Sequence, residues 1–236
     1  MFSIIIPTYN EADRIAQTIS EIYVANRNHE TEIIVVDGGS TDGTINIANH
    51  CGAAVVQSKR KGRAAQMNMG ASAAKYEILY FLHADSIPPH NFTSAIFNAC
   101  NDGAKSGCFR LQFDSDHWFL KANAWFTRFN VNAIRFGDQS LFVTKEIFQK
   151  VSGFREDLLI MEDQEIISRL KKFGKFEVID DYVTTSAQKY RDNGVYRMQG
   201  IFFLIWGLYY LGYSQGELIQ LHRKLIKNHK LYYKSL

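Results

Sequence analysis

The first hundred residues alternate short apolar runs with helical patterns, and this alternation constrains the fold more than any other feature of the sequence. Runs rich in β-branched and aromatic residues occupy 2–7, 32–37, 53–57 and 77–82, with helical patterns between them. Strand–helix alternation at this spacing predicts a mostly parallel sheet that is covered by helices on both faces. The fold class that we expect is therefore α/β.

Polar residues follow three of these strands. Because the carboxyl ends of parallel strands meet at one edge of a sheet, where ligands bind, residues that are distant in sequence are expected to lie together there. These residues are Thr8, Tyr9, Asn10, Glu11, Asp37, His83 and Asp85.

The second half of the chain is less regular. Strands are expected over 105–113 and 140–143, and helices over 117–130, 162–173, 195–211 and 215–233. No internal repeat and no linker rich in Pro or Ser divides the 236 residues, so we expect a single domain over 1–236. Its parts are a first half, a second half and a C-terminal helical extension, over 1–104, 105–190 and 191–236.

Composition excludes several classes of protein. Hydrophobic residues make up 46% and charged residues 22% of the chain, which excludes disorder as the main state. The net charge of +3 is too small to indicate a nucleic-acid partner. The three cysteines lack the spacing of a disulfide framework or a metal site. The longest apolar stretch, 200–212, is shorter than the roughly 20 residues of a bilayer span. With no targeting signal at the N-terminus, a cytoplasmic location is expected.

Five motifs stand in order along the chain. They are "IIIPTYNE" (4–11), "IIVVDGGSTDGT" (33–44), "FLHADS" (81–86), "GDQSLFVTKEIFQKVSGF" (137–154) and "MEDQEIISRL" (161–170). Together they resemble the family 2 glycosyltransferases, which have the GT-A fold. The resemblance implies transfer of a sugar from a nucleotide-diphosphate sugar, with UDP-sugars favoured, to an acceptor hydroxyl. It implies that 1–104 binds the donor and that 105–190 carries the acceptor and catalytic residues.

Two positions depart from the family pattern, and one segment resembles a particular subgroup of the family. Gly38 stands where the family has the second aspartate of a DD pair, and His83 stands at the first acidic position of its D-x-D motif. The segment 184–200, "TTSAQKYRDNGVYRMQG", resembles a bacterial subgroup that is named for radical-SAM, selenodomain or arsenosugar biosynthesis association.

The donor contacts begin with Asp37, a carboxylate at the end of an apolar strand that requires a hydrogen-bond donor if it is buried. The resemblance assigns it to the nucleobase, whereas an Asx turn or helix cap is the alternative. Thr8 and Glu11 are assigned to the base or ribose, with capping of the next helix by Asn10 as the alternative. The other donor contacts that the resemblance implies are Pro7, Tyr9, Gly39, Arg63, Ala84 and Asp138.

Arg63 follows the basic residues 59–61 and opens a helix, and helix N-termini favour anions such as a diphosphate. A solvated loop is the alternative. Asp138 is assigned to the donor or acceptor sugar.

Asp85 is the candidate metal ligand, with His83 beside it on an extended segment. A divalent cation neutralises the charge of a diphosphate leaving group, and Mg²⁺ takes one or two protein carboxylates together with phosphate oxygens. Mn²⁺ tolerates an imidazole ligand better. A turn residue is the alternative for Asp85, and a ribose or diphosphate contact or plain packing is the alternative for His83.

Asp163 is the candidate catalytic base, because a carboxylate within hydrogen-bond reach can remove the proton of an acceptor hydroxyl. Glu162 is the second candidate. One base without a covalent carboxylate implies a single displacement with inversion at the anomeric carbon. The alternative is that the acids of this segment stabilise the N-terminus of a helix.

The C-terminal helices leave three interpretations open. Their aromatic and basic residues suit a homodimer interface, contact with an anionic membrane surface, or packing against the main domain.

Two other functions compete with sugar transfer. A non-catalytic nucleotide-sugar-binding protein would explain the loss of an acidic D-x-D position. A sugar nucleotidyltransferase is expected to carry a Gly-rich loop near the N-terminus, and "PTYNEADR" (7–14) offers none. An NAD dehydrogenase is disfavoured because its glycine fingerprint is absent.

Overall fold

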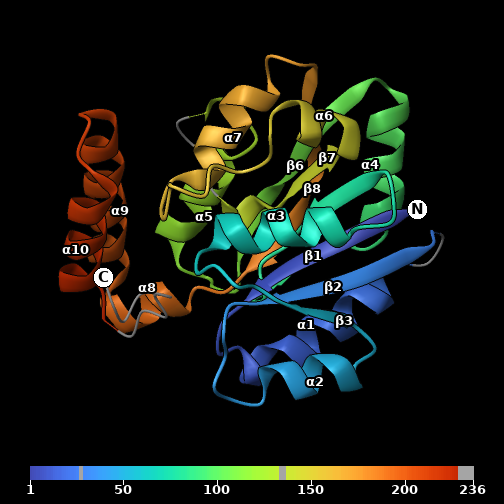
Figure 1. The fold of residues 1–236 in the computed structure, drawn as a ribbon. Helices are drawn as coiled ribbons and strands as arrows, with labels where there is room; N and C mark the ends of the chain where they lie inside the picture. Colours follow the sequence, from blue (N-terminus) through green and yellow to red (C-terminus); the bar gives the residue numbers. More distant parts are fainter. Residues whose placement is uncertain (27–28, 133–136, 228–236) are drawn as a thin grey trace.

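The computed structural model describes residues 1–26, 29–132 and 137–227 (Figure 1). The strands of this part form one eight-stranded sheet. They are β1 (Phe2–Thr8), β2 (Thr31–Asp37), β3 (Ala54–Gln57), β4 (Ile78–Phe81), β5 (Ser86–Ile87), β6 (Ala104–Phe113), β7 (Leu141–Thr144) and β8 (Lys175–Thr185). The helices are α1 (Ala12–Ala25), α2 (Thr44–His50), α3 (Arg63–Ala73), α4 (Phe92–Asn101), α5 (Trp118–Phe126), η2 (Gly137–Gln139), α6 (Lys145–Lys150), α7 (Glu162–Leu170), α8 (Gln188–Asn193), α9 (Val195–Tyr210) and α10 (Gln215–Leu225).

The strand order is β3-β2-β1-β4-β7-β6-β8-β5. β1 pairs in parallel with β2 and β4, and β2 pairs in parallel with β3, as the alternation of the first half predicts. The three antiparallel pairings, β4 with β7, β6 with β7, and β5 with β8, each involve a strand of the second half. The expected α/β class is confirmed, with a mixed rather than purely parallel sheet.

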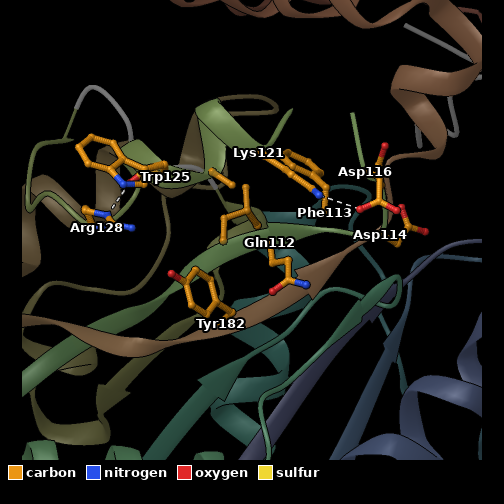
Figure 2. A pocket seen from close by; sticks show the side chains of 11 residues that line it. Gln112, Phe113, Asp114, Asp116, Lys121, Trp125, Arg128 and Tyr182 are labelled. Atoms are coloured by element: carbon orange, nitrogen blue, oxygen red, sulfur yellow. Dashed lines mark hydrogen bonds and ion pairs between the residues drawn. The ribbon is translucent and has the colours of Figure 1, made fainter. Parts of the chain in front are cut away.

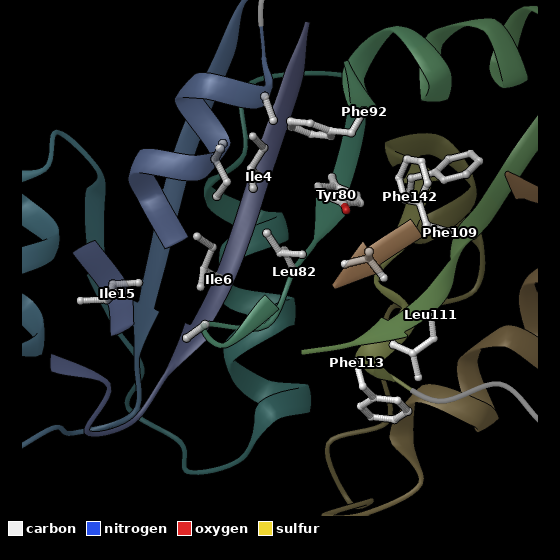
Figure 3. Close-up of a cluster of buried hydrophobic side chains, with 14 of the residues drawn as sticks. Ile4, Ile6, Ile15, Tyr80, Leu82, Phe92, Phe109, Leu111, Phe113 and Phe142 are labelled. Carbon is white, nitrogen blue, oxygen red and sulfur yellow. The ribbon is translucent and has the colours of Figure 1, made fainter. Parts of the chain in front are cut away.

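The sheet has a core on each face because successive residues of a strand point to opposite sides. Ile4 and Ile6 pack with residues of α1, α4, α5 and α9, whereas Ile5 packs with residues of α3, α6 and α7. Figure 3 shows the first core, in which the Tyr80 ring lies 5.1 Å from that of Phe92 between ring centroids. Both faces of the sheet are therefore covered, as expected of a ligand-binding α/β sheet.

Five elements were not expected from the sequence: β5, η2, α6, α8 and β8. The longest of them, β8, carries Asp180 and Asp181 in its middle, which interrupts the apolar pattern of a strand. The two aspartates fall where the register with β6 shifts, between the pairs Phe109–Ile179 and Arg110–Tyr182. This irregularity resembles a β-bulge, which re-aims the side chains that follow it.

The C-terminal helices α9 and α10 stand to one side of the sheet (Figure 1). Gln199 of α9 accepts hydrogen bonds from Asn123 of α5 and Tyr190 of α8. The side-chain oxygen of Gln215, at the start of α10, accepts from the backbone N–H groups of Leu159 and Ile160 at 2.9 and 3.1 Å. The extension is thus anchored to the loop that leads into α7. In the part of the chain that the structure describes, no helix has the length and apolar character needed to cross a bilayer.

Replacing Gly107 of β6 with alanine is expected to destabilise the fold severely. A Cβ there would lie 2.2 Å from the backbone oxygen of Glu177 and 2.5 Å from the ring of Phe142. Since a backbone atom must move, we expect a loss near the upper end of the roughly 1–3 kcal/mol of overpacking, measured by urea unfolding. The control is Gly200→Ala in α9, where a Cβ meets no atom within 4 Å. Equal stability of the two variants would contradict this prediction.

Candidate functional site

The loops after β1 and β2 are joined to each other by hydrogen bonds. The backbone N–H groups of Asn10 and Glu11 donate to the hydroxyls of Ser40 and Thr44, both at 2.8 Å. In the opposite direction, the N–H of Thr41 donates to Asn10 Oδ1 at 2.8 Å. No side chain caps α1 from its N-cap position, which is Glu11. The alternative that Asn10 caps this helix is therefore wrong, since Asn10 binds the neighbouring loop instead.

Asp37 is fully buried and holds the loop that follows it. Its Oδ2 accepts from the N–H groups of Gly39 and Ser40, both at 2.8 Å, and its Oδ1 accepts from the Ser40 hydroxyl at 2.5 Å and from Thr8 Oγ1 at 3.4 Å. Gly39 has a φ of +93°, which favours glycine. This is the Asx-turn arrangement, and Thr8 is also fully buried.

Three other predicted donor contacts lie along the same edge of the sheet. Pro7 is buried in β1, Tyr9 is half-buried just beyond it, and Ala84 is buried after β4. The Ala84 carbonyl accepts a hydrogen bond from Thr18 Oγ1 at 2.7 Å, which ties the turn after β4 to α1. The edge therefore brings together residues from the first and third motifs.

Gln66 of α3 is a site residue that the sequence analysis missed. It is fully buried, and its side-chain N–H₂ group donates to the carbonyls of Thr8 at 2.8 Å and Val36 at 2.7 Å. It thereby fixes the N-terminal turn of α3 against the ends of β1 and β2. The sequence signal that could have indicated it is that Gln66 is the one polar residue among the small and apolar residues of 64–67.

His83 and Asp138 form a pair across 55 residues of sequence, with 3.1 Å between His83 Nδ1 and Asp138 Oδ1. Burial opposes the charged imidazole, but the hydrogen bond with Asp138 and the charges of Asp138 and Asp163 outweigh it, so the pKa of His83 is raised. Although burial opposes its ionisation, the His83 hydrogen bond lowers the pKa of Asp138. The carboxylate therefore orients the imidazole and holds its Nδ1.

Arg63 and Glu162 form a second pair, with 2.9 Å between Arg63 Nε and Glu162 Oε1. The Glu162 side chain is 1% exposed and that of Arg63 is 30% exposed. Burial raises the pKa of Glu162 to about 7, with the Asp163 charge acting in the same direction and that of Arg63 opposing it. Glu162 thus lies beneath the arginine at the start of α3 and presents no surface to an acceptor.

Asp163 and His83 line the same small cavity, of about 10 Å³, beside Phe81 and Ser140. This volume is close to that of a single water position. Asp163 and Asp85 are both partly exposed, and neither carboxylate has a hydrogen bond or ion pair within the described residues. The structure therefore brings Asp163, His83 and Asp138 together and leaves two carboxylates available to a ligand.

A compact metal cluster is not preformed at this edge. Within residues 1–26, 29–132 and 137–227, no group of three or more His, Cys, Asp and Glu side chains is placed to hold a metal ion. The expected extended segment at His83 and Asp85 is wrong: the Ser86 N–H donates to the His83 carbonyl at 3.1 Å and closes a turn that contains Asp85, as the alternative for this residue held. A cation at this turn would need phosphate oxygens of a bound donor among its ligands.

Replacing Glu162 with glutamine is expected to flatten the dependence of stability on pH. Because the folded protein holds the Glu162 proton to a higher pH than the unfolded chain does, the free energy of unfolding falls as pH rises from about 4.5 to about 7. The variant lacks this titration. Between pH 4.5 and pH 7 its free energy of unfolding should therefore rise relative to that of the wild type by up to about 3 kcal/mol, measured by urea unfolding. Glu77→Gln, at an exposed position, is the control for loss of one charge. Parallel pH profiles of wild type and Glu162→Gln would refute the prediction.

A family model described as glycosyl transferase family 2 matches residues 3–160. The match covers more than half of the chain, and the chain therefore belongs to glycosyl transferase family 2. This confirms the family that the five motifs indicated.

Two curated relatives match parts of the chain. Glycosyltransferase AglE of Haloferax volcanii is 33% identical over 93 residues, which are 36% of this chain and 31% of that protein. Glycosyltransferase GlyG of Streptococcus pneumoniae serotype 4 is 32% identical over 106 residues, 41% of this chain and 34% of that protein. The chain thus spans about a third of the length of these relatives.

Solved structures of similar shape establish the fold. The mannosyltransferase PcManGT from Pyrobaculum calidifontis, in complex with GDP-Man and Mn²⁺, matches with a TM-score of 0.72 at 18% identity, over 95% of this chain and 69% of that chain. S. aureus TarS 1–349 in complex with UDP-GlcNAc matches with a TM-score of 0.65 at 16% identity, over 95% and 71% of the two chains. The expected GT-A fold is confirmed.

Proposed function

We propose that the protein is an inverting glycosyltransferase that moves a sugar from a nucleotide-diphosphate sugar to an acceptor hydroxyl. The observation that carries the proposal is the convergence of His83 and Asp163 on one cavity at the ligand-binding edge of the sheet. The family assignment supports sugar transfer, and the nucleotide-sugar complexes of PcManGT and TarS support the donor class. UDP as the nucleotide is part of the proposal.

In this mechanism Asp163 accepts the proton of the acceptor hydroxyl. The acceptor oxygen forms a bond to the anomeric carbon while the bond from that carbon to the diphosphate oxygen breaks. The proton passes to a carboxylate oxygen of Asp163, which has no competing hydrogen bond among the described residues. With a single displacement, the configuration at the anomeric carbon inverts.

Arg63 is proposed to receive the diphosphate. It opens α3, where the backbone N–H groups also favour an anion. Glu162 lies beneath it at 2.9 Å and orients the guanidinium, so we assign Glu162 a positioning role. Asp138 orients His83 in the same way.

The cofactor in this proposal is Mg²⁺ or Mn²⁺, held by Asp85 and His83. The fit is chemical: the Asp85 carboxylate and His83 Nε2 make no hydrogen bond among the described residues, and Asp138 holds the other ring nitrogen. When bound, the cation supplies positive charge that stabilises the departing diphosphate.

The remaining parts of the proposal concern organisation and partners. Residues 1–236 form one domain, in which 1–104 binds the donor and 105–190 the acceptor. The segment 184–200, which forms the end of β8, α8 and the start of α9, supports membership of the radical-SAM-, selenodomain- or arsenosugar-associated subgroup.

For location, we propose the cytoplasm with peripheral membrane contact through the C-terminal helices. Exposed apolar residues of α9, such as Phe203 and Leu204, and basic residues in the last turn of α10 support it. A homodimer through α9 is the other partner proposal, and sedimentation with and without anionic vesicles separates the two.

A thermal-shift screen of nucleotide sugars with Mn²⁺ tests the proposed donor class. A ligand that binds only the folded state stabilises it by about 2.7 kcal/mol at a hundred times its dissociation constant. We expect a UDP-sugar to raise the melting temperature more than uridine alone. Metal-dependent binding with no transfer across donors and acceptors would favour the non-catalytic alternative. Release of pyrophosphate from a nucleoside triphosphate and a sugar phosphate would favour a nucleotidyltransferase.

A further inference from the structure

A second cavity, of about 580 Å³, lies between α5, the end of β6 and β8 (Figure 2). Its volume is in the range of small-molecule sites, which is about 300–1,000 Å³. It contains none of the predicted donor or catalytic residues.

Two aromatic side chains border the cavity. Trp125 of α5 is 47% exposed and Tyr182 of β8 is 37% exposed. Arg128 covers one face of Trp125, with its guanidinium carbon 4.4 Å from the ring centroid. The register shift after Ile179 moves Tyr182 two positions along β6, so that it lies opposite Arg110 instead of Gln112. The cavity therefore offers two partly exposed aromatic side chains, and Arg128 covers one face of Trp125.

Unpaired polar groups stand beside these rings. The side-chain amide of Gln112, the hydroxyl of Tyr182 and the terminal nitrogens of Arg128 make no hydrogen bond within the described residues. Figure 2 shows Gln112 and Tyr182 next to each other on the floor of the cavity. These groups include donors and acceptors at the same place.

The charges of the cavity balance. Lys121 pairs with Asp116 at 2.7 Å, and Asp114 pairs with Arg191 at 3.0 Å. The lining itself holds as many cations, Lys121 and Arg128, as carboxylates, Asp114 and Asp116, so its formal charges cancel. Exposed aromatic rings beside the neutral polar groups of Gln112 and Tyr182 and the charged donors of Arg128 suit a ligand that has both apolar C–H faces and many hydroxyls.

We propose that this cavity binds a neutral saccharide, the body of the acceptor glycan, whose ring packs on Tyr182 and Trp125 and whose hydroxyls bind Gln112 and Arg128. The identification as acceptor rests on the proposed function. The binding of a saccharide does not rest on it.

Helix α8 connects this cavity to the proposed transfer site. The Asp114 carboxylate on the cavity wall accepts hydrogen bonds from Arg191 and from the N–H of Ala187, just before α8. Burial opposes the ionisation of Asp138, and the His83 hydrogen bond and then the charge of Lys189, on the same helix, lower the pKa of that carboxyl. A glycan in the cavity would thus lie next to the helix that borders the His83–Asp138 pair, as expected of an acceptor whose terminal sugar reaches Asp163.

The test measures saccharide binding without donor, by saturation-transfer NMR and calorimetry on the full chain. The probes are maltose, cellobiose, lactose, α-1,2-mannobiose and N,N′-diacetylchitobiose. We expect at least one to bind, and Tyr182→Ala or Gln112→Ala to weaken that binding about tenfold. Tyr213→Ala is the matched control, because Tyr213 is 48% exposed and lies outside the cavity lining.

The outcomes separate this proposal from the proposed function. If no probe binds, if inorganic phosphate binds instead, or if both cavity variants bind like the wild type, the saccharide site is wrong. Donor binding and donor hydrolysis by Tyr182→Ala should equal those of the wild type, since Tyr182 does not touch the donor edge. Saccharide binding that persists when no nucleotide sugar binds would support the cavity and reject the proposed transfer.

Discussion

Replacing Asp163 with asparagine is expected to abolish sugar transfer while nucleotide binding is retained. The carboxylate borders the cavity that it shares with His83, and asparagine has nearly the same shape but accepts no proton at neutral pH. Loss of a general base lowers the rate by about 10²–10⁴. The rate of transfer is measured with the donor that the thermal-shift screen selects, and donor binding is measured by calorimetry.

Asp157→Asn is the matched control, because this exposed carboxylate in the loop before α7 pairs with Arg155 and lies outside the proposed site. It should retain wild-type transfer. If Asp163→Asn transfers sugar at the wild-type rate, Asp163 is not the base. If Asp163→Asn no longer binds the donor, Asp163 has a role in donor binding instead.

Replacing Asp85 with asparagine is expected to remove the dependence of donor binding on Mn²⁺. Asp85 is the only carboxylate of the proposed metal pair, and asparagine is a neutral, weaker ligand. Since metal stabilisation of a leaving group contributes several kcal/mol, transfer should fall by at least about a hundredfold. Calorimetry with UDP, with and without Mn²⁺, measures the binding directly.

Addition of EDTA to the wild-type protein should reproduce the effect of Asp85→Asn. The control is Asp102→Asn, at the exposed C-cap of α4. If Asp85→Asn binds UDP and Mn²⁺ as the wild type does, the metal ligands lie elsewhere. If EDTA leaves transfer unchanged, the metal is not required.

The first half of the fold was predictable because its strands are short, apolar and bounded by turn residues. The observed β1, β2, β3 and β4 match the expected runs to within a residue or two. The same logic brought Asp37, His83 and Asp85 to one edge, since the carboxyl ends of parallel strands meet there. The helix expected over 215–233 begins as predicted, but it ends at Leu225 because the backbone of Ile226 is extended; residues 228–233 lie outside the described chain.

The rest of the site depends on contacts between residues that are distant in sequence, and no local sequence pattern predicts such contacts. Glu162 lies 99 positions after Arg63, and its burial beneath that arginine follows from the packing of α7 beside α3 rather than from the "MED" motif. The Asn10 side chain binds the loop of Thr41, 31 residues away, instead of its own helix. Tyr182 lies opposite Arg110 because β8 carries two extra residues, Asp180 and Asp181, relative to β6.

The hydrogen bonds between the β1 and β2 loops bear on how tightly a nucleotide can bind. Ordering a flexible segment on binding costs about 1–2 kcal/mol of binding free energy for each residue that becomes fixed. The hydrogen bonds of Asn10, Asp37 and Ser40 already hold these residues in the folded protein, so a ligand would not have to order them. A rigid receptor keeps most of its contact energy as affinity. If a nucleoside binds between these loops, it should therefore enter a preformed site, and the change in heat capacity on binding should be small.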